Sequence, residues 1–306
     1  MAAAAAAAAG APGSTDGAQG LLARSPPGQF DIVAKEIRGI VGADGFPDAA
    51  VAAAREAHLK SERPVLEVGK GHFVALCPEG QVGPGKFVDS KRAAVVCVDM
   101  VTGKPSEGGD GDGDAAAVLG EAGSPVRAAR EAVVGELETY AGHAFSFRGT
   151  RHGAVEVFVS GEDLTVVLSG VKTRLDNFWA AQWQSTWTVS GAAGASPSLS
   201  GSVRVTTHYF EDGNVQLRAA KDFAAVPLKG AATPEKLAEA VRRAIADTED
   251  AYQAALAAVV QSVEGETMRD LRRAMPLSGQ PMAWNLNAHR FRRALPSAKS
   301  GAGSSS

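Results

Sequence analysis

The feature that most constrains the fold of this 306-residue chain is one long, unbroken helical pattern near its end. Thr233 can cap a helix whose first turn holds Pro234, and Pro276 ends the pattern. One stripe recurs at helical spacing: Leu237, Val241, Ala244, Thr248, Tyr252, Ala255 and Val259. A helix over residues 233–275 would be about 60 Å long at about 1.5 Å per residue. A helix of that length must lie along a large sheet or against a partner protein.

A block of strand patterns, residues 144–228, precedes this helix. Its alternating runs are separated by turn residues at short spacing, which predicts an antiparallel meander. Asp212-Gly213 favours a type I′ hairpin turn, because both central residues of that turn need a positive φ. Odd-numbered positions of one run form an aromatic face, for which core packing is the commoner role: Trp179, Trp183, Ser185, Trp187 and Val189.

The first half of the chain alternates helical and strand patterns. Residues 25–62 predict two helices joined by a short turn, and residues 124–142 predict a third helix capped by Ser124. The first two helices would form an αα-hairpin. Residues 63–102 are rich in β-branched residues between glycine and proline turns, which predicts strands. The composition between residues 103 and 124 is typical of a loop.

Both ends of the chain have biased compositions. Residues 1–24 are rich in alanine and glycine and lack a basic start, so we expect a disordered leader and no signal peptide. The last residues, 296–306, are also expected to be disordered. No stretch approaches the roughly 20 strongly apolar residues of a membrane span. Cys77 and Cys97 form no CxxC pair, which fits a reducing cytosol.

The motifs of catalysis and metal binding are missing from the sequence. One acidic run imitates a calcium loop through Asp110, Asp112, Asp114 and Glu121, but Ala115 stands where the loop needs glycine. The histidines form no metal-ligand pair, and no nucleophile elbow or phosphate loop occurs. We therefore predict no enzyme activity, no metal and no cofactor. The net charge of -3 also argues against binding to nucleic acid.

The last patterned stretch, residues 268–295, mixes arginines with large apolar side chains. Seven Lys or Arg and one acid lie from Met268 to Lys299, a charge of +6, which leaves about -9 for the rest of the chain. Residues 277–295 predict a short amphipathic arm with Trp284 on its apolar side. Two partners fit this arm: an acidic protein surface, which arginine pairs favour, and an anionic membrane or phosphoinositide surface.

Four motifs carry a family resemblance in matching order and spacing from about residue 25 to 293. They are PPGQF at 26–30, NFWAAQWQSTWTV at 177–189, HYFEDGNVQL at 208–217, and DLRRAMP with AWN in the tail. Together they resemble the alpha subunit of the heterodimeric F-actin-capping protein family. The resemblance is strongest in the second half of the chain.

This resemblance implies an α+β fold with an N-terminal helical bundle, or stalk, made of residues 25–62 and 124–142. An antiparallel sheet, a long C-terminal helix across it and a C-terminal arm complete the implied fold. The family is not enzymatic, and its alpha subunit pairs with a beta subunit so that two sheets become one. The heterodimer binds the barbed end of actin filaments and blocks subunit addition and loss, here expected to be independent of calcium. Phosphoinositides and capping-inhibitor proteins are the expected regulators. The expected location is the cytoplasm, at the cytoskeleton.

The resemblance also implies which residues bind actin. Basic positions at the end of the long helix correspond to Arg269 and Arg273, with Arg272 beside them, and Trp284 matches a tryptophan of the family's tail. The family's next basic position is Gly279 here, and a large aliphatic position is Ala288. Two outcomes are open: the changes weaken the contact surface, or the arginines of the terminal helix restore it. Residues of the terminal helix complete the expected site: Arg290, Phe291, Arg292 and Arg293.

Overall fold

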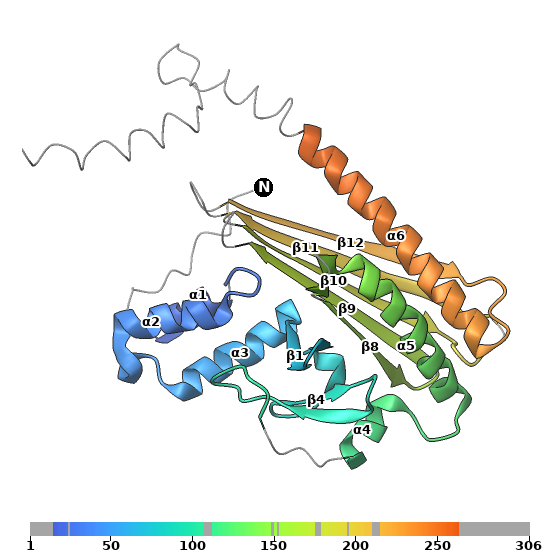
Figure 1. The fold of residues 1–306 in the computed structure, drawn as a ribbon, viewed down its shortest axis with the longest axis horizontal. Helices are drawn as coiled ribbons and strands as arrows, with labels where there is room; N and C mark the ends of the chain where they lie inside the picture. Colours follow the sequence, from blue (N-terminus) through green and yellow to red (C-terminus); the bar gives the residue numbers. More distant parts are fainter. Residues whose placement is uncertain are drawn as a thin grey trace, which may run out of the picture. The chain divides into compact units, whose positions relative to one another are not determined.

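The fold is seen in a computed structural model of the chain (Figure 1). It combines helices with antiparallel sheets, which confirms the predicted α+β class. The chain divides into two compact units, residues 1–248 and 249–306, and each is described by itself. The structure describes the following residues: 15–23, 25–106, 112–147, 150–151, 153–174, 179–194, 196–209 and 215–262.

Helices and strands alternate in the first half of the chain, and long strands dominate the second. The helices are α1 (Thr15–Ala23), α2 (Phe30–Gly45), α3 (Asp48–Glu62), the short 3-10 helix η1 (Pro78–Gly80), α4 (Asp112–Leu119), α5 (Pro125–Ala144) and α6 (Pro234–Ser262). The short strands are β1 (Val65–Gly69), β2 (His72–Ala75), β3 (Gln81–Gly83), β4 (Lys86–Asp89), β5 (Ala94–Cys97), β6 (Ser146–Phe147) and β7 (Thr150–Arg151). The strands of the main sheet are β8 (Gly153–Ser160), β9 (Asp163–Arg174), β10 (Trp179–Ser190), β11 (Ser198–Tyr209) and β12 (Val215–Pro227).

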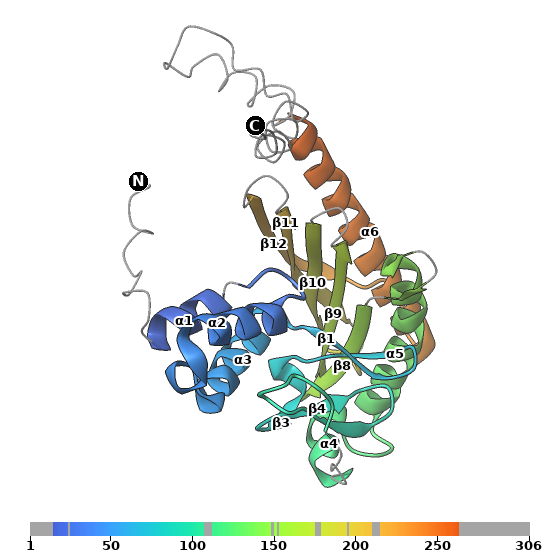
Figure 2. The same cartoon turned by 60° about the vertical axis from the view of Figure 1, so that its left-hand side comes forward.

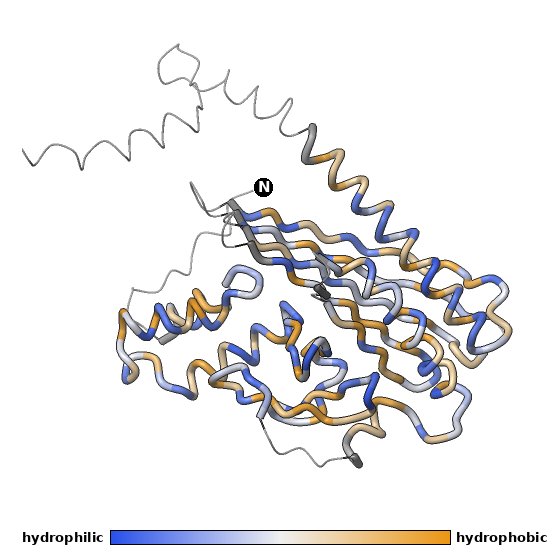
Figure 3. Tube along the Cα trace, viewed as in Figure 1, coloured by the Kyte–Doolittle hydropathy of each residue, from blue (hydrophilic) through white to orange (hydrophobic). Residues whose placement is uncertain are grey.

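The main sheet is a five-stranded antiparallel meander in the order β12-β11-β10-β9-β8. Neighbouring strands pair along nearly their whole length, and Trp187 of β10 lies opposite Val166 on one side and Gly201 on the other. Successive side chains of a strand point to opposite faces. The odd-numbered positions of β10 therefore share one face, as their parity predicted. Figure 3 shows hydrophobic and hydrophilic residues alternating along these strands.

Helix α5 packs on β8 and β9 on this odd face of the sheet. Figure 2 shows the first half of α6 beside α5, on the same side of the sheet. Arg242 of α6 and Glu136 of α5 form an ion pair, with 2.9 Å between Nε and Oε2. Trp187 is buried on this face, and its ring centroid lies 5.5 Å from that of Phe223. A Cβ atom added at Gly201 would come within 2.5 Å of the Trp187 ring. Glycine therefore leaves the space that the indole occupies.

The predicted caps of α5 and α6 are present. Ser124 Oγ accepts a hydrogen bond from the Arg127 N–H at 3.2 Å, and Thr233 Oγ1 accepts one from the Lys236 N–H at 3.4 Å. These contacts satisfy backbone donors that the first turn of a helix leaves without an intrahelical partner.

Helix α6 buries much of the predicted stripe as far as Tyr252, and its last described turns depart from it. Leu237 and Val241 are fully buried, together with Ile245. Val259, predicted on the same stripe, is instead 57% exposed. The helix is described to Ser262, so the rest of the predicted 233–275 helix and the arm at 277–295 lie outside the described residues.

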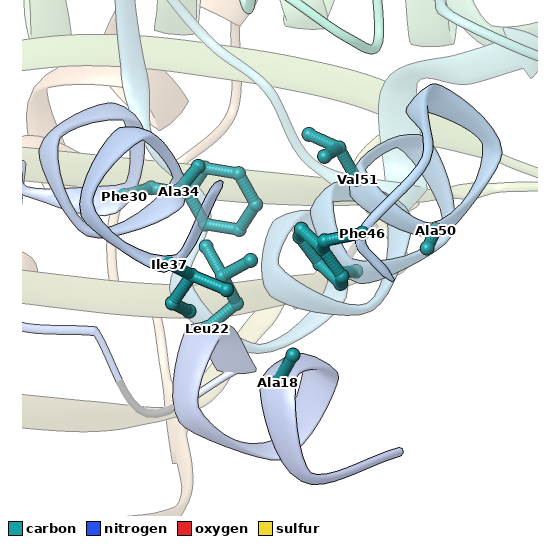
Figure 4. Packing of buried hydrophobic residues seen from close by; sticks show 9 residues of the cluster. Ala18, Leu22, Phe30, Ala34, Ile37, Phe46, Ala50 and Val51 are labelled. Carbon is teal, nitrogen blue, oxygen red and sulfur yellow. The ribbon is translucent and has the colours of Figure 1, made fainter. Parts of the chain in front are cut away.

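Helices α1, α2 and α3 form the N-terminal bundle (Figure 4). Their shared core consists of Ala18, Leu22, Phe30, Ala34, Ile37, Phe46, Ala50, Val51 and Ala54. This corrects two expectations: α1 lies within the segment expected to be a disordered leader, and α5, expected in the bundle, packs on β8 and β9 instead. The glycines of TDGAQGLLA give it low helix propensity, so packing against α2 and α3 is what stabilises the helix.

Polar side chains of the sheet's even face bind the C-terminal end of α3. Gln182 and Gln184 of β10 both donate to the carbonyl of Glu62. Arg204 of β11 donates to the carbonyl of Ser61 at 3.1 Å. The last carbonyls of a helix have no intrahelical partner, and a cation near them is favourable. These contacts, which we call the α3 clamp, attach the bundle to the sheet.

Helix α4 corrects the loop predicted over residues 103–124. It spans Asp112–Leu119, with Ala115 and Leu119 buried against Phe158 and Val167 of the sheet. The segment reads as a loop because its glycines and acids dominate the composition, whereas two apolar residues four apart are enough to dock one short helix. Asp112 and Asp114 belong to this helix, whereas the sequence predicted that they lie in an acidic loop.

A buried carboxyl group joins the small strands to the main sheet. Glu156 of β8 accepts hydrogen bonds from the N–H groups of Ala75 at 3.2 Å and Ser90 at 2.8 Å. Burial raises the pKa of Glu156 to about 8, an effect that the bonds from Ser90 partly offset. Nearby Asp89 pushes the pKa in the same direction as burial. The attachment of β2 and of the residue after β4 to the main sheet therefore involves one ionisable side chain, Glu156.

Candidate partner-binding edge of the sheet

The predicted actin-binding residues lie outside the part of the chain that the structure describes. They are Arg269, Arg272, Arg273, Trp284, Arg290, Phe291, Arg292 and Arg293. Their role therefore stays a prediction. Among the described residues, the surface best suited to a partner is an edge of the main sheet.

Strand β12 forms this edge. Among the described strands β12 pairs with β11 alone, so its other side is an edge that a further strand could join. Most of its described side chains are exposed, among them Leu217 at 44% and Val226 at 49%. A long, exposed edge strand pairs readily with a strand of another chain. The described part of β12 therefore has the form of a docking edge.

The opposite edge of the sheet, β8, is covered. Helix α5 packs on one face of β8, and β2 and α4 also contact the strand. The backbone N–H of Val157 donates to Ser90 Oγ at 3.0 Å. Most β8 side chains are buried. This difference between the edges indicates that a strand of another chain would join the sheet at β12.

A cavity of about 310 Å³ lies beside this edge, between the sheet and the end of α3. Its lining residues are Ala23, Ser61, Glu62, Arg204, Thr206, Arg218, Ala219 and Ala220. We call this cavity the arginine pocket. Arg204 of β11 lies opposite Ala220 of β12, and Arg218 lies opposite Thr206, so the two arginines are diagonal neighbours on one face. Diagonal neighbours are close enough for long side chains to meet.

The arginine pocket contains two basic side chains and one acidic side chain. Burial raises the pKa of Glu62, while Arg218 and then Arg204 oppose that rise. Arg204 also donates to the α3 clamp. Arg218 makes no hydrogen bond or ion pair with another residue of the described part. The pocket therefore presents two guanidinium groups to one partly buried carboxyl group.

Other ionisable groups of the described chain form contacts within the fold. His72 Nε2 lies 2.6 Å from Asp89 Oδ2, and Asp89 Oδ1 accepts from the backbone of Lys91. Burial raises the pKa of the Cys77 thiol well above its ordinary value, which keeps it protonated and unreactive. Within the described ranges, no group of His, Cys, Asp or Glu side chains is arranged to hold a metal ion. None of the described helices is long and apolar enough to span a bilayer.

Reasoning from the sequence missed the arginine pocket. Its only signal was that Arg204 and Arg218 lie in two neighbouring strand patterns, on either side of Asp212-Gly213. A two-residue turn at that dipeptide would place Arg218 opposite Thr207, on the face away from Arg204. The observed pairing is shifted by one residue, and this shift brings the two arginines onto one face.

Comparison with known proteins accounts for this fold. The sequence model of the F-actin capping protein alpha subunit matches residues 18–294. The chain is 26% identical over 278 residues to the F-actin-capping protein subunit alpha of Dictyostelium discoideum, covering 87% of this chain and 92% of that protein. The corresponding protein of Caenorhabditis elegans is 26% identical over 271 residues, covering 88% of this chain and 92% of that protein.

A solved structure has a similar fold. It is that of a homodimeric actin capping protein alpha subunit from Plasmodium berghei, with a TM-score of 0.69 and 17% identity. The likeness covers 86% of this chain and 96% of that one. At that identity the structure supports the fold alone, while the sequence match, which extends over most of the chain, supports the family. This chain belongs to the F-actin capping protein alpha subunit family.

Proposed function

We propose that this chain is the alpha subunit of a heterodimeric actin-capping protein. The heterodimer binds the barbed, fast-growing end of an actin filament and blocks addition and loss of actin subunits. It acts in the cytoplasm, at the cytoskeleton. The second subunit is a capping protein beta subunit, which joins the sheet at β12.

The open edge at β12 is the observation that best supports this assembly. The strand is 13 residues long and exposes its free side, while β8 at the other edge is covered. Addition of a partner strand would satisfy backbone groups along this edge and would cover the exposed side chains of Leu217 and Val226. The edge has room for one strand, which fits a dimer.

Elongation of actin from barbed-end seeds tests the proposal. The chain is co-expressed with a candidate beta subunit, and the purified heterodimer is added to pyrene-labelled actin. We expect elongation to stop at saturating heterodimer. Elongation that continues unchanged would contradict the proposed function.

We further propose that the tail makes the contact with actin. Arg269, Arg272 and Arg273 stand before Pro276, and the aromatic and basic residues of the arm follow it. The +6 charge of this region suits an acidic partner surface, and arginine suits carboxylates that accept two hydrogen bonds. The remaining proposed contacts belong to the arm: Trp284, Arg290, Phe291, Arg292 and Arg293.

Paired substitutions separate this role from a structural one. Changing Arg269 and Arg273 to alanine should slow capping while the heterodimer stays intact in size-exclusion chromatography. Arg243→Ala is the matched control, because Arg243 is an exposed arginine of α6 before the tail. Equal capping rates for both variants would show that the tail arginines do not contact actin, and loss of the heterodimer would show that they are structural.

Two regulatory expectations belong to the same proposal. Capping should not change when calcium is replaced by a chelator, since two acids of the imitation calcium loop lie in α4. Phosphoinositides and capping-inhibitor proteins should act through the basic arm, because negative charge on either would occupy the arginines that the arm otherwise presents to actin. The elongation assay with and without each additive measures both effects.

A further inference from the structure

We propose that the strand joining β12 inserts an acidic side chain, Asp or Glu, into the arginine pocket between Arg204 and Arg218. The proposal rests on the proposed heterodimer and adds what the partner strand must supply at this edge. It makes the pocket the feature that selects which strand pairs with β12.

The position of the pocket suits a side chain of an added strand. Ala219 and Ala220 of β12 both line it, so the cavity reaches the free edge itself. Side chains of an added strand alternate between the two faces of the sheet. Pockets that receive alternate side chains give such strand addition its specificity, while the backbone bonds supply affinity. One side chain of the added strand on the even face would therefore meet the pocket.

The charges on this face suit a single carboxylate. Two arginines on diagonal positions repel one another, and Glu62 offsets only one of the two charges. The pocket thus carries a net charge of about +1, which one Asp or Glu neutralises. A phosphate group carries close to two negative charges and would leave an excess beside Glu62. Asp222 projects from the same face of β12 but does not line the pocket.

Arg218 is the better-placed of the two cations. Arg204 already donates from one nitrogen to the Ser61 carbonyl, whereas Arg218 has no hydrogen bond or ion pair within the described part of the chain. A free guanidinium offers a planar fork for two parallel bonds to a carboxylate. Arg218 is also exposed, so its replacement leaves the core of the sheet untouched.

Subunit exchange of the intact heterodimer tests the proposal. The chain is co-expressed with a beta subunit, and dissociation is followed by a fluorescent label at low and at high salt. At low salt, Arg218→Ala should speed dissociation by about two- to tenfold, and high salt should reduce the difference. Arg218→Lys should lie between the two. Lys221→Ala is the matched control, because Lys221 is exposed on the same strand but projects from the opposite face.

A second step identifies the carboxylate. Each Asp or Glu in the partner's edge strand is changed to its amide, alone and together with Arg218→Ala. One amide variant should speed exchange only when Arg218 is present, which is the signature of a direct pair. Circular dichroism of each variant checks that the fold is kept.

The outcomes separate this proposal from the proposed function. If the heterodimer forms and Arg218→Ala exchanges no faster than Lys221→Ala, only the role of the pocket is overturned. If no heterodimer forms with the unchanged chain, both proposals fall. If Arg218→Ala leaves exchange unchanged but lowers retention on vesicles containing phosphoinositide, the pocket is a lipid headgroup site and the proposal is again overturned.

Discussion

Replacing Leu22 with alanine tests whether α1 is part of the folded bundle. Leu22 is fully buried against α2 and α3, while its neighbour Leu21 is 57% exposed. Leu→Ala removes three carbons, which is worth about 2.4 kcal/mol at about 0.8 kcal/mol each. The unfilled cavity adds to that figure, so we expect Leu22→Ala to cost about 3 kcal/mol. Leu21→Ala should cost about 1 kcal/mol or less, because over half of that side chain already contacts water.

Hydrogen exchange is the most direct measurement. The bundle contains no tryptophan, so amide exchange in α2 and α3 reports on it better than fluorescence does. Exchange in both helices should speed up in Leu22→Ala and change little in Leu21→Ala. Urea unfolding followed by circular dichroism supplies the free-energy difference. If the two variants behave alike, α1 does not pack in the bundle and the reasoning is refuted.

Two further predictions concern the sheet and its surroundings. Gly201→Ala should destabilise the chain by about 1–3 kcal/mol in urea unfolding, because the added Cβ collides with the Trp187 ring; Gly39→Ala, in an exposed helical position with no atom nearby, should be neutral or stabilise by up to about 1 kcal/mol. Equal losses for the two would contradict the close packing. Glu156 has a folded-state pKa of about 8, raised above its ordinary value of 4.5, so its contribution to stability is fully present below that ordinary value and is lost as the pH rises through about 8. Urea midpoints from pH 5 to 9 should fall less steeply for Glu156→Gln than for the unchanged chain, and parallel curves would exclude Glu156 as the titrating group.

The sheet was predictable because its signals are local. Trp183 and Trp187 share parity with their neighbours, and that parity alone assigns a strand with one apolar face. The caps at Ser124 and Thr233 were predictable for the same reason, since each needs only residues within one turn.

What could not be predicted depends on contacts between distant segments. Leu22 and Leu119 anchor short helices in alanine- and glycine-rich stretches, where local propensity is weak and only the partner surface decides. The arginine pocket needs the exact pairing of β11 with β12, and a shift of one residue would place Arg204 and Arg218 on opposite faces. A hairpin dipeptide predicts a turn, but it does not determine the pairing of the two strands to the exact residue.

Arg204 belongs both to the α3 clamp and to the arginine pocket. A carboxylate that draws its guanidinium toward the edge would pull on the same side chain that holds the Ser61 carbonyl. Gln182 and Gln184 of the neighbouring strand β10 bind the carbonyl of Glu62, the next residue of α3. The end of α3 is therefore held by two strands, and a movement of β11 alone would strain its bonds to β10. The α3 clamp therefore connects the free edge of the sheet to the bundle through one side chain, so a change in the position of Arg204 on strand addition would act directly on the end of α3.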